Sequence, residues 1–361
     1  MKRGNGRKIV VGMSGGVDSS ISLILLKRND WKPIGVSLKF GVWDDKCNAK
    51  RENACCTDKS IKTAQKICKK YSCKHVILDV SKNFHEKVIK YFTKTLKDAE
   101  TPNPCIICNR YLKFFELFDY AKKNKIDYVA TGHYAKIVKS SKYGSYFISR
   151  PKDRKKDQTY YLAMLPQEWL PYIIFPLSDI KKEEVYKMAE KENLDFFQKI
   201  AQSQNFCFVS EKSLYNFIEK EIGAIAGVIK NTEGKLLGKH IGLAHYTIGQ
   251  RKNIGLSGGP YFVVKKDLAR NELTVSKRKK DLLKNKISLN NVSLTNSVLN
   301  NKKVGIKAKI RYQHKPAKAT LDVLKNRKYS LTFENPQPSI TPGQYAVFYS
   351  GNLVVGAGQI R

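Results

Sequence analysis

Two groups of residues in this sequence have the types and the spacing that chemistry requires. The first is the segment Gly12 to Ser20, GMSGGVDSS, which lies between an apolar run typical of a strand and one typical of a helix. Adjacent glycines let the backbone approach a ligand closely, and the N–H groups at a helix N-terminus bind phosphate oxygens. The serines add hydroxyl donors, and Asp18 is placed either to hold Mg²⁺ or to orient the loop. Neither GxxxxGK[ST] nor GxGxxG is present, so we predict a phosphate loop of another type. A glycine-rich turn with a serine helix cap is the alternative.

The second group consists of cysteines. Cys105 and Cys108 form a CxxC in the proline-stiffened segment 101–110, TPNPCIICNR, which leads into a predicted helix, and Cys207 stands apart in the sequence NFCF. A helix N-terminus lowers the pKa of a thiol and so supplies thiolate near neutral pH.

Other uses of the cysteines stay open. A CxxC is also typical of half a zinc site, of a redox pair and of an iron–sulfur site. A zinc site would need a second pair, and Cys55 and Cys56 are adjacent rather than suitably spaced. The isolated Cys68 and Cys73 are interpreted as small buried apolar residues.

Strands that alternate with helices must position these groups in the first half of the chain. Apolar runs predict strands, and apolar residues at three- and four-residue spacing predict the helices between them. The predicted strands are Lys8–Val11, Ile34–Phe40, His75–Val80 and Tyr128–Thr131. This alternation predicts an α/β domain with a doubly wound parallel sheet, whose ligands bind beyond the carboxyl ends of the strands.

The composition of the sequence changes after about residue 222. Glycine becomes frequent there, and the apolar segments become short and alternating. We expect a small β-rich central domain followed by a C-terminal β-barrel. The predicted boundaries are 1–222 for the α/β domain, 223–283 for the central domain and 284–361 for the barrel.

The charge of the chain points to a polyanionic partner. It has 67 Lys and Arg against 31 Asp and Glu, a net charge of +36, which favours nucleic acid first and an anionic membrane surface second. A Lys-rich coding bias is the alternative. No apolar run is long enough to span a bilayer, and the N-terminal apolar run is too short for a signal peptide. With eight cysteines and no secretory signal, we expect a reducing, cytoplasmic location.

Several motifs, taken together and in order, resemble the tRNA-specific 2-thiouridylase family of N-type ATP pyrophosphatases. They are SGGVDSS, TPNPCIICNR, ATGHYAKI (130–137), KDQTYYL (156–162), NFCF, HYTIGQRKNIG (245–255) and TPGQYAVFY (341–349). The resemblance spans nearly the whole chain and implies an ATP pyrophosphatase domain, a central domain and a C-terminal β-barrel. It also implies ATP-dependent adenylation of the C2 oxygen of the wobble uridine, then replacement of that oxygen by sulfur, with release of AMP and pyrophosphate.

The resemblance assigns roles residue by residue. Cys207 corresponds to the cysteine that carries a persulfide, and Cys108 to its partner nucleophile. The residues implied to bind ATP are Gly12, Met13, Ser14, Gly15, Gly16, Val17, Asp18, Ser19, Leu38 and Gly132. Those implied to contact tRNA are Asn103, Pro104, Cys105, His133, Lys156, Asp157, Gln158, Arg311, Tyr312 and Gln344.

One residue departs from the family pattern TPNPDxxCN. Cys105 replaces an Asp that is thought to assist proton transfer, so this role is vacant or falls to the thiol. Cys105, Cys108 and Cys207 could instead bind a [4Fe–4S] cluster with one open iron able to hold hydrosulfide. A Cys207 persulfide released through Cys108 and cluster-bound sulfide therefore both stay open.

Partners and rival functions follow from the same residues. The resemblance implies tRNAs for Lys, Glu and Gln, and a cysteine desulfurase or a sulfur-relay protein as the sulfur donor; Mg²⁺ is expected with ATP. One rival is another ligase with this phosphate loop, of the GMP synthetase or argininosuccinate synthase type, which needs neither the cysteines nor the basic charge. The other is a non-catalytic RNA-binding protein, which the complete SGGVDSS argues against.

Overall fold

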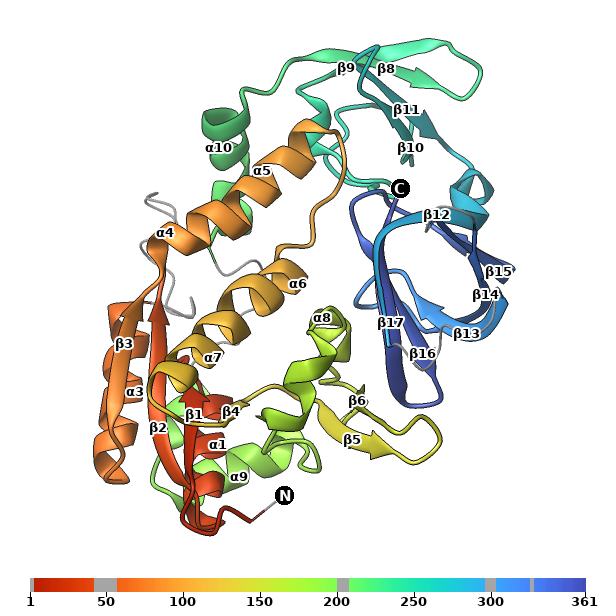
Figure 1. The fold of residues 1–361 in the computed structure, drawn as a ribbon. Helices are drawn as coiled ribbons and strands as arrows, with labels where there is room; N and C mark the ends of the chain where they lie inside the picture. Colours follow the sequence, from red (N-terminus) through yellow and green to blue (C-terminus); the bar gives the residue numbers. More distant parts are fainter. Residues whose placement is uncertain (1–2, 42–56, 200–207, 296–302, 325–327) are drawn as a thin grey trace. The chain divides into compact units, whose positions relative to one another are not determined.

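A computed structural model describes residues 3–41, 57–199, 208–295, 303–324 and 328–361 (Figure 1). The chain divides into two compact units, each assembled from separate stretches of sequence. The first comprises Met1–Val88, Cys105–Ser213 and Asn352–Val354, and the second comprises Ile89–Pro104, Leu214–Gly351 and Val355–Arg361. No helix within the described residues has the length and apolar character needed to cross a membrane.

The first unit is built on a parallel five-stranded sheet. Its strands, in spatial order, are β3 (His75–Asp79), β2 (Lys32–Lys39), β1 (Lys8–Gly12), β4 (Tyr128–Thr131) and β7 (Ile173–Ile174). In the pairing register, Gly12 lies opposite Val36 of β2 and Thr131 of β4. The carboxyl ends of three neighbouring strands therefore meet around the start of the glycine-rich loop, as the sequence predicts.

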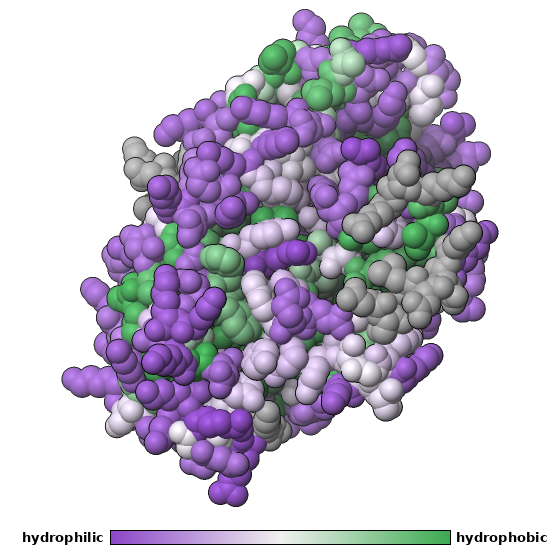
Figure 2. Space-filling view, in the orientation of Figure 1, coloured by the Kyte–Doolittle hydropathy of each residue, from purple (hydrophilic) through white to green (hydrophobic). Residues whose placement is uncertain are grey.

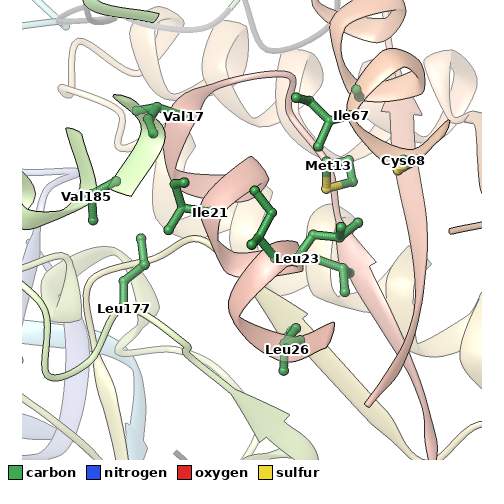
Figure 3. Packing of buried hydrophobic residues seen from close by; sticks show 14 of the residues in the cluster. Met13, Val17, Ile21, Leu23, Leu26, Ile67, Cys68, Leu177 and Val185 are labelled. Carbon is green, nitrogen blue, oxygen red and sulfur yellow. The ribbon is translucent and has the colours of Figure 1, made fainter. Parts of the chain in front are cut away.

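Helix α1 (Val17–Arg28) packs its apolar residues against β1 and against α9 (Lys182–Lys191). Ile9 and Val11 of β1 and Ile21 and Leu23 of α1 are all fully buried in one cluster. Figure 3 labels Ile21 and Leu23 in this cluster, with Val185 of α9 nearby. Burial on all sides of α1 contributes about 1.5–3 kcal/mol for each large apolar side chain. This packing fixes the first turn of α1, which carries the predicted phosphate loop.

The other helices of the first unit include a long helical segment with an interruption. Its parts are α6 (Pro104–Cys108), the π-helix η2 (Asn109–Lys113) and α7 (Phe114–Lys123). The remaining helical elements are α3 (Asp58–Lys70), α4 (Ser81–Phe84), the π-helix η1 (His85–Ile89), α8 (Thr159–Leu162), η3 (Gln167–Tyr172) and η4 (Asp195–Lys199). A hairpin that the sequence analysis did not predict, β5 (Lys136–Ser140) and β6 (Ser145–Ser149), pairs with Leu353 and Val354.

The described residues of the second unit include a four-stranded sheet of mixed direction, the helices α5 (Lys90–Lys97) and α10 (Glu211–Ile222), and the short 3-10 helices η5 (Leu243–His245) and η6 (Lys279–Leu282). The sheet has the order β10 (Phe262–Asp267), β11 (Glu272–Ser276), β8 (Gly227–Asn231) and β9 (Leu236–His240). Phe92 of α5 meets Phe217 of α10 edge to face, with ring centroids 5.7 Å apart. A helix from the first hundred residues is thus part of this later unit.

The C-terminal strands close into a six-stranded barrel. They are β12 (Leu283–Leu294), β13 (Lys303–Lys309), β14 (Ala317–Val323), β15 (Tyr329–Pro338), β16 (Tyr345–Ser350) and β17 (Leu353–Ile360). The spatial order is β12-β15-β14-β13-β16-β17, and pairing of Leu289 with Ile360 joins the two ends. The expected fold class, a parallel α/β domain followed by a β-rich domain and a β-barrel, is confirmed.

Candidate functional site

The glycine-rich loop needs glycine at Gly15 for two independent reasons. Its φ of +73° lies in the left-handed region, and a Cβ built there would be 2.1 Å from the carbonyl oxygen of Ser60, at the start of α3. Gly16, the N-cap of α1, has an extended conformation and makes no side-chain cap hydrogen bond. Because glycine has no side chain that could cap the helix, the first amides of α1 are left without an N-cap side-chain acceptor, which suits a phosphate cradle.

Gly132 closes the other side of this loop. A Cβ at Gly132 would lie 2.7 Å from the carbonyl carbon of Asp18 and 2.8 Å from the amide nitrogen of Ser19. Only glycine lets the end of β4 approach the first turn of α1 this closely. Gly132, which is predicted to bind ATP, therefore lies directly against the backbone of Asp18 and Ser19.

Hydrogen bonds hold the loop from within. Ser19 Oγ donates to the carbonyl of Gly16 at 3.0 Å and lies 3.3 Å from Ser14 Oγ. Ser37 Oγ, on the buried part of β2, donates to the carbonyl of Met13 at 2.8 Å and lies 2.9 Å from His75 Nε2. Of the two serines predicted to bind phosphate, Ser19 is buried and helps to shape the loop, whereas Ser14 is exposed.

Asp18 is engaged by two residues that the sequence analysis did not single out. Lys182 Nζ, at the first position of α9, donates to Asp18 Oδ1 and Oδ2 at 2.6 and 2.8 Å, and the Tyr134 hydroxyl donates to Oδ1 at 2.8 Å. Burial, together with the Asp18 carboxylate, raises the pKa of Tyr134, so its hydroxyl keeps its proton. Of the two roles expected for Asp18, this geometry favours orientation of the loop over binding of Mg²⁺.

The predicted KDQ segment supports the same network. Gln158 Oε1 accepts from the amide of Tyr134 at 2.9 Å, and the Gln158 amide donates to the Tyr134 carbonyl at 3.0 Å. Asp157 is buried, accepts from Arg150 Nε at 2.6 Å and from the Thr159 hydroxyl at 2.6 Å. The side chains of Asp157 and Gln158 thus make contacts inside the protein, whereas Lys156 is half-buried.

His133 lies between aromatic rings directly after Gly132. Its ring stacks on Phe114 at 6.0 Å between centroids, meets Phe175 edge to face, and has Nδ1 2.8 Å from Thr131 Oγ1. Burial, with a smaller contribution from the Lys113 charge, lowers the pKa of His133 to about 3. The imidazole is therefore neutral at physiological pH and offers one donor and one acceptor.

The CxxC is placed on one helix. Cys105 and Cys108 both belong to α6, three residues apart and hence on neighbouring positions of one helix face; Cys105 is half-buried, and Cys108 is buried with 3% exposure. Cys207 lies outside the described residues, so its distance from this pair is not part of the structure. Cys47, Cys55 and Cys56 also lie outside them.

Cys68 is buried, as the sequence predicts, whereas Cys73 is only half-buried. Cys68 is fully buried in the main cluster, and burial, with the neighbouring Cys73, raises its pKa to about 12. Burial also raises the pKa of Cys73. Neither thiol is activated for chemistry.

In the second unit, Gln344 joins two motifs that are far apart in sequence. Its Nε2 donates to the carbonyls of Thr101 and Pro102 at 3.2 and 2.9 Å, and its Oε1 accepts from Asn103 Nδ2 at 3.3 Å. Gly343, at φ +87°, permits this approach, because a Cβ there would lie 2.7 Å from the Thr101 carbonyl oxygen. The structure therefore brings together Asn103 and Gln344, which were both predicted to contact tRNA.

Arg311 is also used inside the second unit. Its guanidinium donates to the carbonyl of Ile248 at 2.8 Å and to the hydroxyl of Thr341. The HYTIG and TPGQ segments are thus held by one side chain from the barrel. Tyr312, the next residue, is half-buried with Lys309 Nζ 5.1 Å from its ring centroid.

Leu38, predicted to lie near the adenine, follows the buried part of β2. Leu38 is half-buried at the carboxyl end of β2. Over the ranges that the structure describes, no group of three or more His, Cys, Asp or Glu side chains is arranged to hold a metal ion. A cluster on Cys105, Cys108 and Cys207 is not tested by this finding, because one ligand is outside those ranges.

Comparison with known proteins covers the whole chain. Three family models match: a tRNA methyl transferase HUP domain at residues 7–211, a tRNA methyl transferase PRC-barrel domain at 215–277 and an aminomethyltransferase β-barrel domain at 284–360. The 2-thiouridylase MnmA of Clostridium acetobutylicum is 37% identical over 358 residues, which cover 98% of this chain and 99% of that protein. MnmA 1 of Thermoanaerobacter sp. is 40% identical over 368 residues, which cover 100% and 99%.

Among solved structures, a 4-thiouridine synthetase in complex with RNA and ATP aligns with 61% of this chain and 52% of its own. The TM-score is 0.34 and the identity 14%, which is too distant to inform function. The full-length relatives are far closer. This chain therefore belongs to the family of tRNA-specific 2-thiouridylases.

Proposed function

We propose that this protein is an ATP-dependent tRNA sulfurtransferase that converts the wobble uridine of tRNA to 2-thiouridine. The observation that carries the proposal is full-length membership in the 2-thiouridylase family, combined with a glycine loop that the fold builds at the carboxyl edge of the sheet. The sulfur chemistry is proposed for the thiols of Cys105, Cys108 and Cys207.

The first step is activation of a poor leaving group. The C2 oxygen of uridine attacks the α-phosphate of ATP, the bond to pyrophosphate breaks, and the base carries AMP on that oxygen. The oxygen then leaves as phosphate, whose conjugate-acid pKa is about 6 against about 15.7 for hydroxide. We propose that Gly12–Ser19 and Gly132 bind the triphosphate with Mg²⁺, and that Leu38 lies beside the adenine.

The second step, in the persulfide form, uses two cysteines. The terminal sulfur of a Cys207 persulfide attacks C2, AMP leaves, and the base is held to Cys207 through a disulfide. The Cys108 thiolate then attacks the Cys207 sulfur, forming a Cys108–Cys207 disulfide and releasing 2-thiouridine. A dithiol reductant must return the disulfide to two thiols before the next turnover. Because Cys108 is buried, this step requires the site to open around α6.

The alternative form uses a [4Fe–4S] cluster on Cys105, Cys108 and Cys207. The residues present fit in part: two thiols lie three residues apart on α6, and Cys105 takes the place of the family's usual Asp. When bound, such a cluster would supply hydrosulfide at an open iron, and no disulfide would form.

We propose that the tRNA contacts lie at Asn103, Pro104, Cys105, His133, Lys156, Gln158, Tyr312 and Gln344. Asp157 and Arg311 are proposed to act by holding these segments, because their side chains are engaged inside the protein. The net charge of +36 suits the phosphodiester backbone, so binding should weaken steeply with salt. The domain boundaries 1–222, 223–283 and 284–361, the tRNAs for Lys, Glu and Gln, and a desulfurase or relay protein as donor remain part of the proposal.

The test uses protein that is purified anaerobically and analysed for iron and sulfide. This protein is then assayed for thiolation in vitro with ATP, tRNA and a sulfur source. We expect 2-thiouridine, AMP and pyrophosphate in equal amounts. Activity that survives Cys105→Ser in a preparation without iron would exclude the cluster form, whereas Cys108→Ser should abolish activity in both forms. Methylation of tRNA that depends on S-adenosylmethionine, or AMP release that needs a small substrate instead of tRNA, would refute the proposal.

A further inference from the structure

Two aromatic side chains are exposed on the helical segment that carries the CxxC. Tyr111 of η2 and Phe115 of α7 are 43% and 50% exposed. They are four residues apart, which is close to one helical turn. Figure 2 shows hydrophobic residues over the region of α6 and α7 within a mostly hydrophilic surface.

The π-helical turn explains why this face differs from that of the cysteine. In a continuous α-helix, Cys108 and Phe115 would share a face, because seven residues make almost two turns. The five-residue π-helix Asn109–Lys113 lies between them and adds about one residue, which rotates the following face by about 100°. Cys108 consequently points inward at 3% exposure while Phe115 points outward.

The charge around this pair suits a nucleic acid. The Arg110 guanidinium lies 4.9 Å from the centroid of the Tyr111 ring, and Lys113 is on the same turn. From residue 101 to Phe115 the sequence contains no Asp or Glu. The first acidic residue, Glu116, is buried and accepts from Asn83 Nδ2 at 2.7 Å. Asp119, one turn beyond Phe115, is paired with Lys123 at 2.7 Å, so the basic side chains Arg110 and Lys113 determine the charge beside Tyr111.

We infer that Tyr111 and Phe115 form a stacking platform for an unpaired nucleobase of the tRNA, next to the base that is modified. Single-stranded RNA is held by stacking of its bases on exposed aromatic rings with cations nearby for the phosphates. Phe115 follows Cys108 by seven residues, about 10 Å along the helix, which is within the reach of a neighbouring nucleotide. This inference rests on the proposed function, because it takes the anticodon loop as the ligand.

The test compares binding of an anticodon stem–loop RNA by variants of the full-length protein. Tyr111→Ala with Phe115→Ala should weaken the Kd by about 5- to 150-fold, whereas Tyr111→Phe with Phe115→Tyr should leave it near the wild-type value. Tyr172→Ala is the matched control, because Tyr172 is 46% exposed on η3 of the same unit. Since the replaced side chains are exposed, all variants should unfold at nearly the wild-type temperature.

A direct readout comes from 2-aminopurine placed in the RNA next to the wobble uridine. Its fluorescence should be quenched on binding to wild type and to the aromatic variant, but not on binding to the double alanine variant. Unchanged Kd and quenching in that variant would overturn the platform, as would wild type that does not bind the RNA.

Two further outcomes separate this inference from its rivals. If the double alanine variant binds RNA normally but loses thiolation only when a protein donor replaces inorganic sulfide, the face binds the donor and the platform is wrong. If wild type binds and quenches the RNA but forms no 2-thiouridine, the proposed function fails while the platform stands.

Discussion

The pairing of Lys182 with Asp18 can be measured by a double-mutant cycle. Lys182→Met and Asp18→Asn keep the shape of each side chain while removing its charge. The Lys182 side chain is 11% exposed and donates to both carboxylate oxygens, but Asp18 is 34% exposed, so solvent screens part of the interaction. Breaking a buried pair costs about 3–5 kcal/mol, and screening reduces this to about 2 kcal/mol for Lys182→Met. We expect a coupling energy of about 1–2 kcal/mol in unfolding.

The coupling between Lys182 and Asp18 should also be measurable in the rate of the first chemical step. Asp18 orients the first turn of α1. Either single variant should therefore lower the rate of ATP–pyrophosphate exchange, and this loss, expressed as an activation free energy, should exceed the loss in the free energy of unfolding. Denaturant unfolding and exchange rates, measured on four proteins, give both cycles. Lys181→Met is the matched control, since Lys181 is the exposed neighbour of Lys182. A coupling energy within 0.3–0.5 kcal/mol of zero, the usual range for independent sites, would refute the reasoning.

Three other expectations follow from described contacts. Gly15→Ala adds a strained φ, costing about 1–2 kcal/mol, and a clash with the Ser60 carbonyl; ATP-dependent pyrophosphate exchange should fall more than tenfold, and wild-type exchange would contradict this. Gln344→Ala removes three hydrogen bonds around Asn103 and should lower the unfolding free energy by about 1–3 kcal/mol in denaturant titrations. The same variant should raise the KM for tRNA, and an unchanged KM would contradict a role of Gln344 in positioning Asn103. Burial lowers the pKa of Lys266 from 10.5 to about 8, so Lys266 makes a contribution to stability that rises with pH between these values, whereas the raised pKa values of Cys68 and Cys73 contribute the opposite slope. The free energy of unfolding of wild type minus that of Lys266→Met should therefore increase with pH over this window in denaturant titrations, and a difference that does not change with pH would contradict the assignment.

The sequence predicted the elements that are set by local pattern. The apolar run before Gly12 and the glycine pair after it are sufficient to indicate a strand, a loop and a helix, and β1 and α1 lie where they were expected. Strand β2 begins at Lys32, two residues before the predicted Ile34, because it pairs with Lys8 of β1. The position of that edge depends on a partner strand and is not visible in the sequence.

Contacts between distant residues could not be predicted. Lys182 is one of many lysines, and nothing local distinguishes it from its neighbour Lys181; only the packing of α9 on α1 brings it to Asp18. The same holds for α5, which lies early in the sequence but packs with α10 through Phe92 and Phe217. The π-helical turn Asn109–Lys113 after Cys108 was likewise not predicted, because the sequence analysis found only a helical pattern there.

Because Gln344 anchors residues 101–103, this segment can become ordered only late in the synthesis of the chain. These residues leave the ribosome long before position 344, so their carbonyls and the Asn103 amide lack their native partner until almost the entire polypeptide has been made. A chain that stalls or is cleaved before the last two barrel strands would retain the phosphate loop but lack a fixed Thr101–Asn103 segment. Such fragments would have the predicted nucleotide-binding loop without the ordered residues that we propose to contact tRNA.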